Sequence, residues 1–356
     1  MGRALRLATR GRGWTSPNPM VGAVIVKRGR VVGEGWHRAA GGPHAEVWAL
    51  QAAGAAARSA TVYVSLEPCS HHGRTPPCTD ALVAAGVARV VAACHDPNPQ
   101  VAGKGVSRLR RAGIAVDVGV LEAEAKRLNE GYFKRVTTGL PLVTLKAAMS
   151  LDGKIATAAG ESRWITSEKA RALSHRLRAA HDAVLTGVGT VLADDPELTV
   201  RLVKGRTPLR VVADSKAQTP PTVRLLSADE RSPIMAVTRQ APAARVRRLE
   251  RAGATVWRLP ARGGQVDLRA LMERLVAVGA NSVLVEAGGS LNAGALEAGL
   301  VDRVYFFIAP VLIGGAEALT PVEGKGVRKL AEVWRLGSVR VRRVGEDVLV
   351  VGEVNG

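Results

Sequence analysis

A short stretch in the first quarter of the chain is the strongest constraint on the fold of the protein. His44 is followed two residues later by Glu46, and Cys69 and Cys78 come after a further helical and strand-like segment. One imidazole and two thiolates form a three-ligand zinc set whose fourth position stays open to water, which distinguishes a catalytic from a structural zinc site. Glu46 would then lie beside the metal without binding it. The pattern predicts a zinc centre that activates water.

This combination is typical of zinc-dependent nucleobase deaminases, in which activated water attacks an amidine carbon and a non-ligand glutamate carries protons. Eight residues separate the two cysteines, whereas most of these enzymes have two. His71 and His72 in the intervening loop are alternative ligands by residue type, but Cys78 opens a predicted helix and is preferred. The plainer interpretation is a core histidine, a surface glutamate and two structural cysteines. Three agreeing elements argue against it.

Composition narrows the class of protein. A chain of 356 residues favours two domains, and no apolar run of 18 residues or secretory signal is present, so neither a membrane span nor export is expected. Three cysteines suit a reducing cytoplasm. The net charge of +19 fits either nucleic acid or small phosphorylated ligands, and 3% aromatic residues leave few stacking platforms for single strands.

Alternating strand and helix patterns in the first half predict a three-layer α/β/α domain with a mostly parallel sheet. Helical composition extends over 44–57 and 122–135, and a break at 137–139 places the boundary between domains 1–140 and 141–356. Asn18 lies in a turn before an apolar strand, where capping of the turn is its ordinary role. Cys94 ends an apolar run and is expected to be buried.

The second half restarts the strand and helix alternation. A helix is predicted over 168–180, a glycine-rich turn at 187–190, a polar linker over 239–251 and an amphipathic helix over 268–278. A buried strand at 282–285 runs into a Gly-Gly-Ser turn that opens a helix. A strand that leads through a glycine turn into a helix N-terminus suits a dinucleotide phosphate, although a simple tight turn explains the glycines equally well.

Several separate motifs resemble one family. From Pro17 onward the chain contains PNPMVGAVIV, HAE, LEPCSHHGRTPPC, DPNPQVAGKG, SLDGK followed by GES and WITS, VGTVLADDPELTVR and VEAGGSLN. Together they resemble the bifunctional riboflavin-biosynthesis deaminase–reductases, in which an eight-residue spacing between the cysteines is characteristic. The resemblance implies an N-terminal cytidine-deaminase-like α/β/α domain and a C-terminal dihydrofolate-reductase-like α/β domain.

The resemblance also implies two reactions. The first half would use one Zn²⁺ to deaminate 2,5-diamino-6-(5-phosphoribosylamino)pyrimidin-4-one. The second half would then use NADPH to reduce the ribosyl group of the product to ribityl. Both substrates and the cofactor carry phosphate, so the positive charge has a use without nucleic acid. Family members commonly form homo-oligomers, and the same is expected here.

Site residues carry over by position in the motifs. His44, Cys69 and Cys78 would hold the zinc, and Glu46 would be the proton carrier. The positions that match deaminase substrate contacts are Asn18, His37 and Arg74. The positions that match NADP contacts are Ala148, Trp164, Thr190, Asp194, Ser215, Gly288, Gly289, Ser290, Leu291, Asn292, Ala293 and Gly294. The positions that match reductase substrate contacts are Ser162, Arg178, Leu198, Arg201 and Glu286. Lys154 matches a basic position near the reacting ribose and is the expected catalytic residue of this half, where it could assist protonation or bind phosphate.

Three other interpretations use the same residues. A deaminase acting on RNA or DNA shares the zinc motif, but the long loop between the cysteines and the second domain argue against it. A basic zinc protein without catalysis is disfavoured by Glu46 and by the open ligand position. A chain with one inactive half is disfavoured because the zinc set, Glu46, Lys154, Arg201 and Glu286 are all present.

Overall fold

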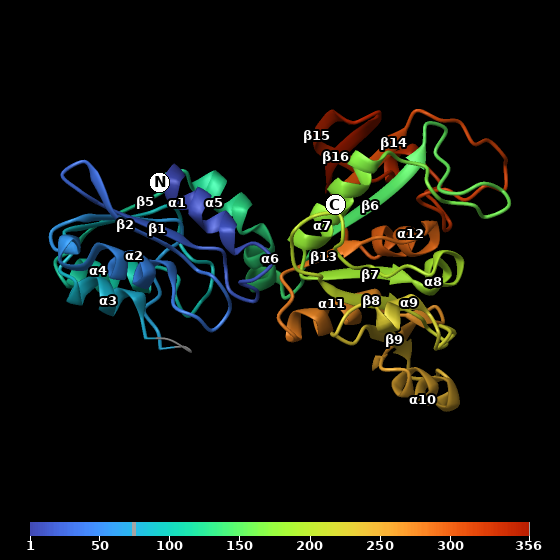
Figure 1. Ribbon diagram of the computed structural model, residues 1–356, viewed down its shortest axis with the longest axis horizontal. Coiled ribbons are helices and arrows are strands. Elements are labelled where there is room, and N and C mark those ends of the chain that lie inside the picture. Colours follow the sequence, from blue (N-terminus) through green and yellow to red (C-terminus); the bar gives the residue numbers. More distant parts are fainter. Residues whose placement is uncertain (73–75, 356) are drawn as a thin grey trace. The chain divides into compact units, whose positions relative to one another are not determined.

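A computed structural model describes residues 1–72 and 76–355. The chain divides into two compact units, Met1–Leu140 and Pro141–Gly356 (Figure 1). Within the described ranges, no helix is both long enough and apolar enough to cross a membrane.

The first unit is built on a five-stranded sheet in the order β2-β1-β3-β4-β5. The strands are β1 (Gly22–Lys27), β2 (Arg30–Trp36), β3 (Thr61–Val64), β4 (Arg89–Ala92) and β5 (Ala115–Val118). β3, β4 and β5 are parallel to one another, and β1 pairs antiparallel with both of its neighbours. Four strands therefore point the same way, as the alternating pattern predicted.

Helices cover both faces of this sheet. The helices are α1 (Gly2–Ala8), α2 (Ala45–Ala53), α3 (Cys78–Ala84), α4 (Lys104–Arg111), α5 (Glu122–Leu128) and α6 (Glu130–Thr138), with short 3₁₀ turns Thr9–Gly11 and Gly54–Ala57. α2, α3 and α4 pack on the face that carries Ile25, while α1 packs on the face that carries Val24. Neighbouring residues of one strand point to opposite faces. The three-layer prediction is confirmed.

Helix α2 lies unusually close to β2 because two strand residues lack side chains. A Cβ built on Gly33 would lie 2.3 Å from the Ala49 carbonyl oxygen, and one on Gly35 would lie 2.4 Å from the Ala45 carbonyl oxygen. Real Cβ atoms do not approach backbone this closely. The glycines thus let the helix backbone rest on the strand, and this contact sets the position of the first turn of α2.

The predicted single helix over 122–135 is wrong in one respect, because the chain forms two helices that meet at Asn129. The Asn129 side chain accepts a hydrogen bond from the Met20 N–H at 2.7 Å and donates to the Met20 carbonyl at 2.9 Å. Arg135 on α6 donates to the Pro17 carbonyl at 3.0 Å. The interruption therefore lets this region hold the loop between Pro17 and Met20.

The second unit contains a nine-stranded sheet in the order β10-β9-β8-β7-β13-β6-β14-β16-β15. The strands are β6 (Leu142–Ser150), β7 (Ala183–Gly187), β8 (Leu209–Ala213), β9 (Ile234–Thr238), β10 (Thr255–Leu259), β13 (Ser282–Val285), β14 (Arg303–Ala309), β15 (Arg335–Val344) and β16 (Asp347–Asn355). The strands from β10 to β14 are parallel, and β16 and β15 extend the sheet antiparallel. β11 (Ala261–Arg262) and β12 (Gln265–Val266) form a separate hairpin.

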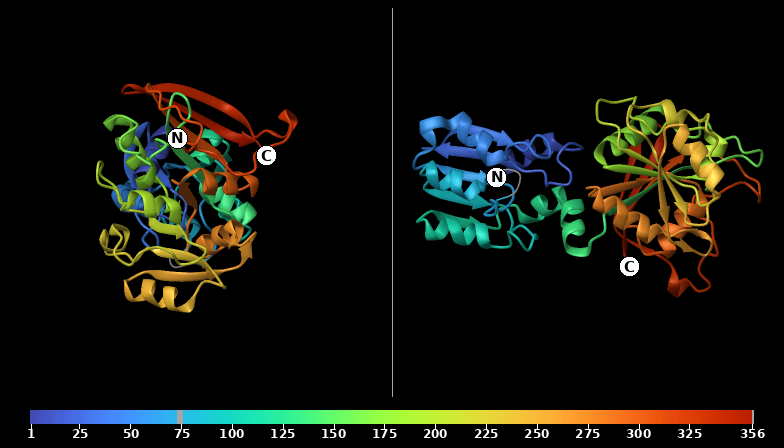
Figure 2. Two further views of the ribbon diagram at one scale, coloured as in Figure 1. Left: turned by 90° about the vertical axis from the view of Figure 1, so that its right-hand side faces the viewer. Right: turned by 90° about the horizontal axis from the view of Figure 1, so that it is seen from below.

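The helices of this unit lie on both faces of the sheet, as the right-hand view of Figure 2 shows. They are α7 (Glu168–Ala180), α8 (Val188–Asp194), α9 (Arg224–Ser227), α10 (Ala243–Arg251), α11 (Leu268–Ala277) and α12 (Gly289–Glu297), with a 3₁₀ turn Leu330–Glu332. α7 and α10 join strands in one direction along the sheet, and α11 and α12 join them in the other. Because parallel crossovers are right-handed, the two pairs cover opposite faces.

Two predictions for this unit are wrong. The glycine-rich turn predicted at 187–190 is instead the end of β7 and the start of helix α8, and the polar linker over 239–251 contains helix α10. α10 is rich in arginine, but Val246 and Leu249 are buried in the core, so one narrow apolar stripe is enough to dock it. Strand β9 was not expected; all five of its residues are buried.

Gly35→Ala should destabilise the first unit by about 1–3 kcal/mol, because the new methyl group must push α2 away from β2. Urea denaturation, with hydrogen exchange in peptides from β2 and α2, measures the loss. Gly2→Ala is the matched control, since a Cβ there meets only ordinary contacts at 3.8 Å and beyond. Equal stability of the two variants would contradict this account of the helix–strand contact.

Candidate active sites

The three predicted zinc ligands converge at one edge of the first sheet. His44 is the residue before α2, Cys78 is the first residue of α3, and Cys69 follows β3. The Nδ1 atom of His44 lies 3.1 Å from the Cys78 sulfur and 3.5 Å from the Cys69 sulfur. Zinc–ligand bonds of 2.0–2.3 Å in a tetrahedron place ligand atoms roughly 3.5 Å apart. The donor set and its spacing fit Zn²⁺.

The charges around this cluster are set by burial and by hydrogen bonds. Hydrogen bonding from Cys78, together with that from His44, lowers the pKa of the Cys69 thiol below its ordinary value despite burial. Hydrogen bonding to Cys69 and burial raise the pKa of Cys78 well above its ordinary value. Glu46 is 3% exposed, and burial raises its pKa to about 6. A carboxyl with this pKa can take up and release a proton near neutral pH.

Asn18 and His37 lie next to the metal cluster. The His37 and His44 rings meet edge to face, with centroids 5.3 Å apart. The Nδ1 atom of His37 is 3.1 Å from the Pro43 carbonyl, which can only accept, so Nδ1 carries the proton and Nε2 accepts from the Asn18 amide at 3.1 Å. Burial lowers the pKa of His37, which keeps the ring neutral. Arg74 lies outside the described residues.

Among the described residues, the histidine and cysteine cluster that could hold a metal consists of His44, Cys69 and Cys78. The alternative ligands His71 and His72 do not belong to it. Cys94 is buried, as expected, but it lies two residues beyond the end of β4 and not in the strand.

Sequence reasoning missed Glu67, which supports the cysteine segment. Its carboxylate accepts hydrogen bonds from the backbone N–H groups of Asp96, Gly103 and Val106 and from the His95 ring. Burial alone would raise the pKa of Glu67, but these donors outweigh burial and lower it. Two residues later comes Cys69, so Glu67 ties the segment that carries this ligand to the loop over 95–106. The sequence signal that could have identified Glu67 is the acidic residue of Glu-Pro-Cys, which lies between a strand and a zinc ligand.

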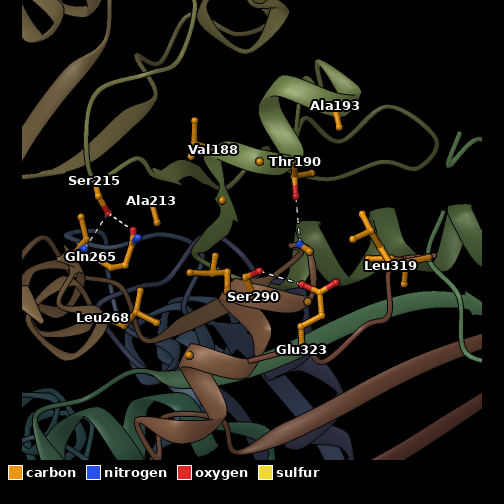
Figure 3. A pocket seen from close by; sticks show the side chains of 18 of the residues that line it. Val188, Thr190, Ala193, Ala213, Ser215, Gln265, Leu268, Ser290, Leu319 and Glu323 are labelled. Carbon is orange, nitrogen blue, oxygen red and sulfur yellow. Dashed lines mark hydrogen bonds between the residues drawn. The ribbon is translucent and has the colours of Figure 1, made fainter. Parts of the chain in front are cut away.

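The second unit has a cavity of about 950 Å³ at the carboxyl ends of β7, β8 and β13 (Figure 3). Most predicted cofactor residues line it, namely Thr190, Asp194, Ser215, Gly288, Gly289, Ser290, Leu291 and Gly294. The first turn of α12 forms one wall, where Gly288 N–H donates to the Thr190 hydroxyl and the Ser290 hydroxyl donates to Glu323. A cavity of this size with a helix N-terminus in its wall fits a dinucleotide.

Four predicted cofactor residues do not line this cavity. The Asn292 side chain is fully buried and donates to the Ala287 and Pro321 carbonyls, and Ala293 is buried in the same helix. Ala148 lies on β6 among the residues of the core. Trp164 is 68% exposed, with the Arg171 guanidinium 4.6 Å from its ring centroid.

The predicted substrate residues of this unit form a buried charged cluster. Arg178 on α7 donates to both carboxylate oxygens of Glu286, at 2.6 and 2.9 Å, and to the Thr199 carbonyl. Lys146 on β6, which sequence reasoning missed, has its amine 3.6 Å from Glu286. Burial would raise the pKa of Glu286, but the charges of Arg178 and Lys146 lower it to about 2. Burial lowers the pKa of Lys146.

A buried histidine holds the neighbouring segment. The Nδ1 atom of His175 accepts the Arg201 N–H at 3.0 Å, and burial with the charges of Arg178 and Arg201 lowers the pKa of His175 to about 4. The Arg201 side chain binds Glu197 at 2.6 Å, and Leu198 is buried. Ser162 donates to Asp194 at 2.6 Å in the wall of the cavity.

Lys154 is placed differently from the other predicted residues. Its amine donates to the Ala318 carbonyl at 3.1 Å, and it is not among the residues that line the cavity.

Comparison with known proteins matches each unit to a different family. Residues 141–350 match the family described as RibD C-terminal domain, and residues 1–94 match the cytidine and deoxycytidylate deaminase zinc-binding region. The riboflavin biosynthesis protein RibD of Escherichia coli is 48% identical over 365 residues, which cover 98% of this chain and 96% of that protein. The RibD of Aquifex aeolicus is 44% identical, over 98% of this chain and 95% of that protein.

The chain belongs to the RibD family. The predicted family, fold class and cofactors are confirmed, with a zinc-binding deaminase unit and a reductase unit of the RibD type that uses NADPH. It is therefore a bifunctional enzyme of riboflavin biosynthesis that acts on small molecules.

Solved RibD structures have the same fold. Acinetobacter baumannii RibD superposes with a TM-score of 0.91 at 40% identity, covering 100% of this chain and 98% of that chain. A Thermotoga maritima structure gives 0.88 at 36% identity, covering 100% and 97%. That protein is described as a diaminohydroxyphosphoribosylaminopyrimidine deaminase/5-amino-6-(5-phosphoribosylamino)uracil reductase.

Glu67→Gln should weaken zinc binding and destabilise the first unit by about 2–4 kcal/mol, because the amide nitrogen must face at least one of the N–H donors that the carboxylate now satisfies. Zinc content after dialysis against graded chelator, with urea denaturation, measures both effects. Asp117→Asn on β5 is the control, since within residues 1–72 and 76–355 that acid is paired with Arg89 at the surface. Retention of zinc equal to that of the control would refute the supporting role.

Proposed function

We propose that the first unit hydrolyses 2,5-diamino-6-(5-phosphoribosylamino)pyrimidin-4-one to 5-amino-6-(5-phosphoribosylamino)uracil and ammonia. The second unit then reduces the ribosyl group of this product to ribityl with NADPH. The observation that carries the proposal is that one chain holds a His-Cys-Cys zinc set with a buried glutamate and a dinucleotide cavity beside a buried charged cluster. The name of the Thermotoga maritima relative states the same two activities.

In the deaminase unit, His44, Cys69 and Cys78 hold the zinc. When bound, zinc lowers the pKa of a water molecule so that it can attack the amidine carbon. Glu46 takes the proton from the water and delivers it to the departing amine, a role that its raised pKa supports. Asn18 and His37 position the pyrimidine from beside the cluster, and Arg74 binds the ribose phosphate.

In the reductase unit, the residues that line the cavity would hold the cofactor, and the backbone N–H groups at the start of α12 would bind its diphosphate. The residues that line the cavity and would contact NADPH are Thr190, Asp194, Ser215, Gly288, Gly289, Ser290, Leu291 and Gly294. Ala148, Trp164, Asn292 and Ala293 do not line it and are left out of the proposed contacts. NADPH supplies the hydride, so this chain supplies position, charge and a proton. Ser162, Arg178, Leu198, Arg201 and Glu286 bind the phosphorylated substrate.

We propose different roles for the two lysines. As hydride reaches the sugar, a proton must also be delivered. Lys146 is the better placed donor, because its amine lies in the buried cluster with Glu286 and burial lowers its pKa. Lys154, whose amine contacts the Ala318 carbonyl, supports binding of the phosphate.

We also infer a cytoplasmic homo-oligomer that does not bind nucleic acid. The three cysteines are free, which suits a reducing compartment. The outer strand β15 carries exposed Val339 and Val341, at 51% and 65%, so a second copy has apolar surface to cover. Light scattering after gel filtration measures the oligomeric state.

The direct test supplies the diaminopyrimidine ribosyl phosphate and NADPH to the protein. Ammonia release and loss of nicotinamide absorbance should both occur, and a zinc chelator should abolish both, since reduction needs the deaminated product. When that product is supplied instead, reduction should continue in the presence of chelator. A zinc-loaded sample that yields neither signal would refute the proposal.

Glu46→Gln should reduce ammonia release by about 100- to 10,000-fold, because the proton carrier is lost. Zinc content and reduction of supplied product should stay at the wild-type level. Turnover of the diaminopyrimidine within tenfold of wild type would show that Glu46 is not the proton carrier.

Lys146→Met should slow reduction of the supplied product by about 100-fold or more if Lys146 donates the proton. Lys154→Met should raise the KM for that product more than it lowers kcat. The affinity for NADPH, measured by fluorescence, should change little in either variant. A larger fall in kcat for Lys154→Met than for Lys146→Met would reverse the two assignments.

A further inference from the structure

The small hairpin β11–β12 forms one wall of the reductase cavity, and it carries a cation. Gly263 and Gly264 make its two-residue turn, both with positive φ, as tight hairpins require. Arg262 and Gln265 are paired across the hairpin, so their side chains leave it on the same face. Both residues line the cavity.

Ser215 fixes this hairpin to the end of β8. Its hydroxyl donates to the Gln265 side-chain oxygen at 2.6 Å and accepts the Val266 N–H at 3.0 Å (Figure 3). Because Arg262 shares a face with Gln265, its guanidinium is presented on the side of Ser215. The Arg262 guanidinium is therefore held at the end of the cavity next to β8.

That end would hold the adenosine half of the cofactor. The inference rests on the proposed function, in which the diphosphate occupies the start of α12 after β13. The buried cluster of Glu286 and Lys146 lies at β13 and β6, while Ser215 follows β8, on the other side of β13 in the strand order. The nicotinamide must face the cluster, so the adenosine ribose extends toward β8.

The carboxylate of Asp214, next to Ser215, is already occupied by hydrogen bonds within the protein and is not free to bind a ribose. In dinucleotide sites, a free carboxylate after the neighbouring strand binds the ribose hydroxyls of NADH and repels a 2′-phosphate. Asp214 is fully buried, and its carboxylate accepts from Gln218 N–H, Thr219 N–H and the Thr219 hydroxyl at 2.7–2.8 Å. The nearby Asp267 uses Oδ1 to cap α11.

Arg262 is available for a new partner. Within residues 1–72 and 76–355 its guanidinium makes neither an ion pair nor a hydrogen bond. Lys325 is the other lysine or arginine in the cavity wall, but it lies two residues from Glu323, which contacts Ser290 on the α12 side. We propose that Arg262 binds the 2′-phosphate of the cofactor and so selects NADPH over NADH.

Calorimetric titration with adenosine 2′,5′-bisphosphate and with adenosine 5′-monophosphate tests this without any hydride transfer. Arg262→Gln should weaken binding of the bisphosphate by at least about tenfold, the loss expected for one charge-assisted contact, and leave the monophosphate unchanged. Arg262→Lys should restore part of the affinity. Arg269→Gln on α11 removes an exposed positive charge outside the cavity wall and should change neither.

Other outcomes distinguish failure of the Arg262 assignment from failure of the proposed cofactor site. Equal loss for both nucleotides in Arg262→Gln, or no loss for either, overturns the role of Arg262 while the cofactor site stands. Loss of discrimination in Lys216→Gln, with Arg262→Gln unaffected, assigns the phosphate to the lysine that follows Ser215. If wild-type protein binds neither nucleotide, the proposed cofactor site itself fails.

Discussion

The zinc centre depends on how closely a helix can approach a strand. Because Gly33 and Gly35 have no side chains, the backbone of α2 rests on β2, and the helix begins where His44 can meet the two cysteines. The cofactor cavity depends on a similar contact, since a Cβ on Gly289 would lie 2.4 Å from the Thr320 carbonyl oxygen. In both units the absence of a side chain lets a helix N-terminus form part of a candidate site.

Prediction from the sequence worked best where a residue type suited to metal or phosphate binding coincides with the start of a helix. His44 precedes a helix, Cys78 begins one and Gly289 begins another, so ligand type and helix start reinforced each other. The zinc set, the positions of most strands along the chain and the family could therefore be predicted. The reductase contacts were predicted only through the resemblance, because residues such as Arg178 and Glu286 are 108 positions apart and meet only in the folded sheet.

The predictions failed where tertiary contacts decided the outcome. Asn129 interrupts a helix in order to bind Met20, more than a hundred residues away, and nothing local distinguishes it from a helical asparagine. Lys146 and His175 become functional candidates only when the sheet and α7 place them against Glu286 and Arg201. The sequence of α10 resembles a polar linker because arginines surround its two core residues.

The support given by Asn129 and Arg135 has a consequence for how this enzyme can be divided. The match to the deaminase zinc-binding region ends at residue 94, and all three zinc ligands precede that point. Yet the loop that carries Asn18 is held from α6 and the junction before it. A complete deaminase domain therefore needs more of the chain than the matched zinc-binding region. A gene fragment that stops after β4 would encode the whole metal set and still lack the residues that keep its substrate loop in place.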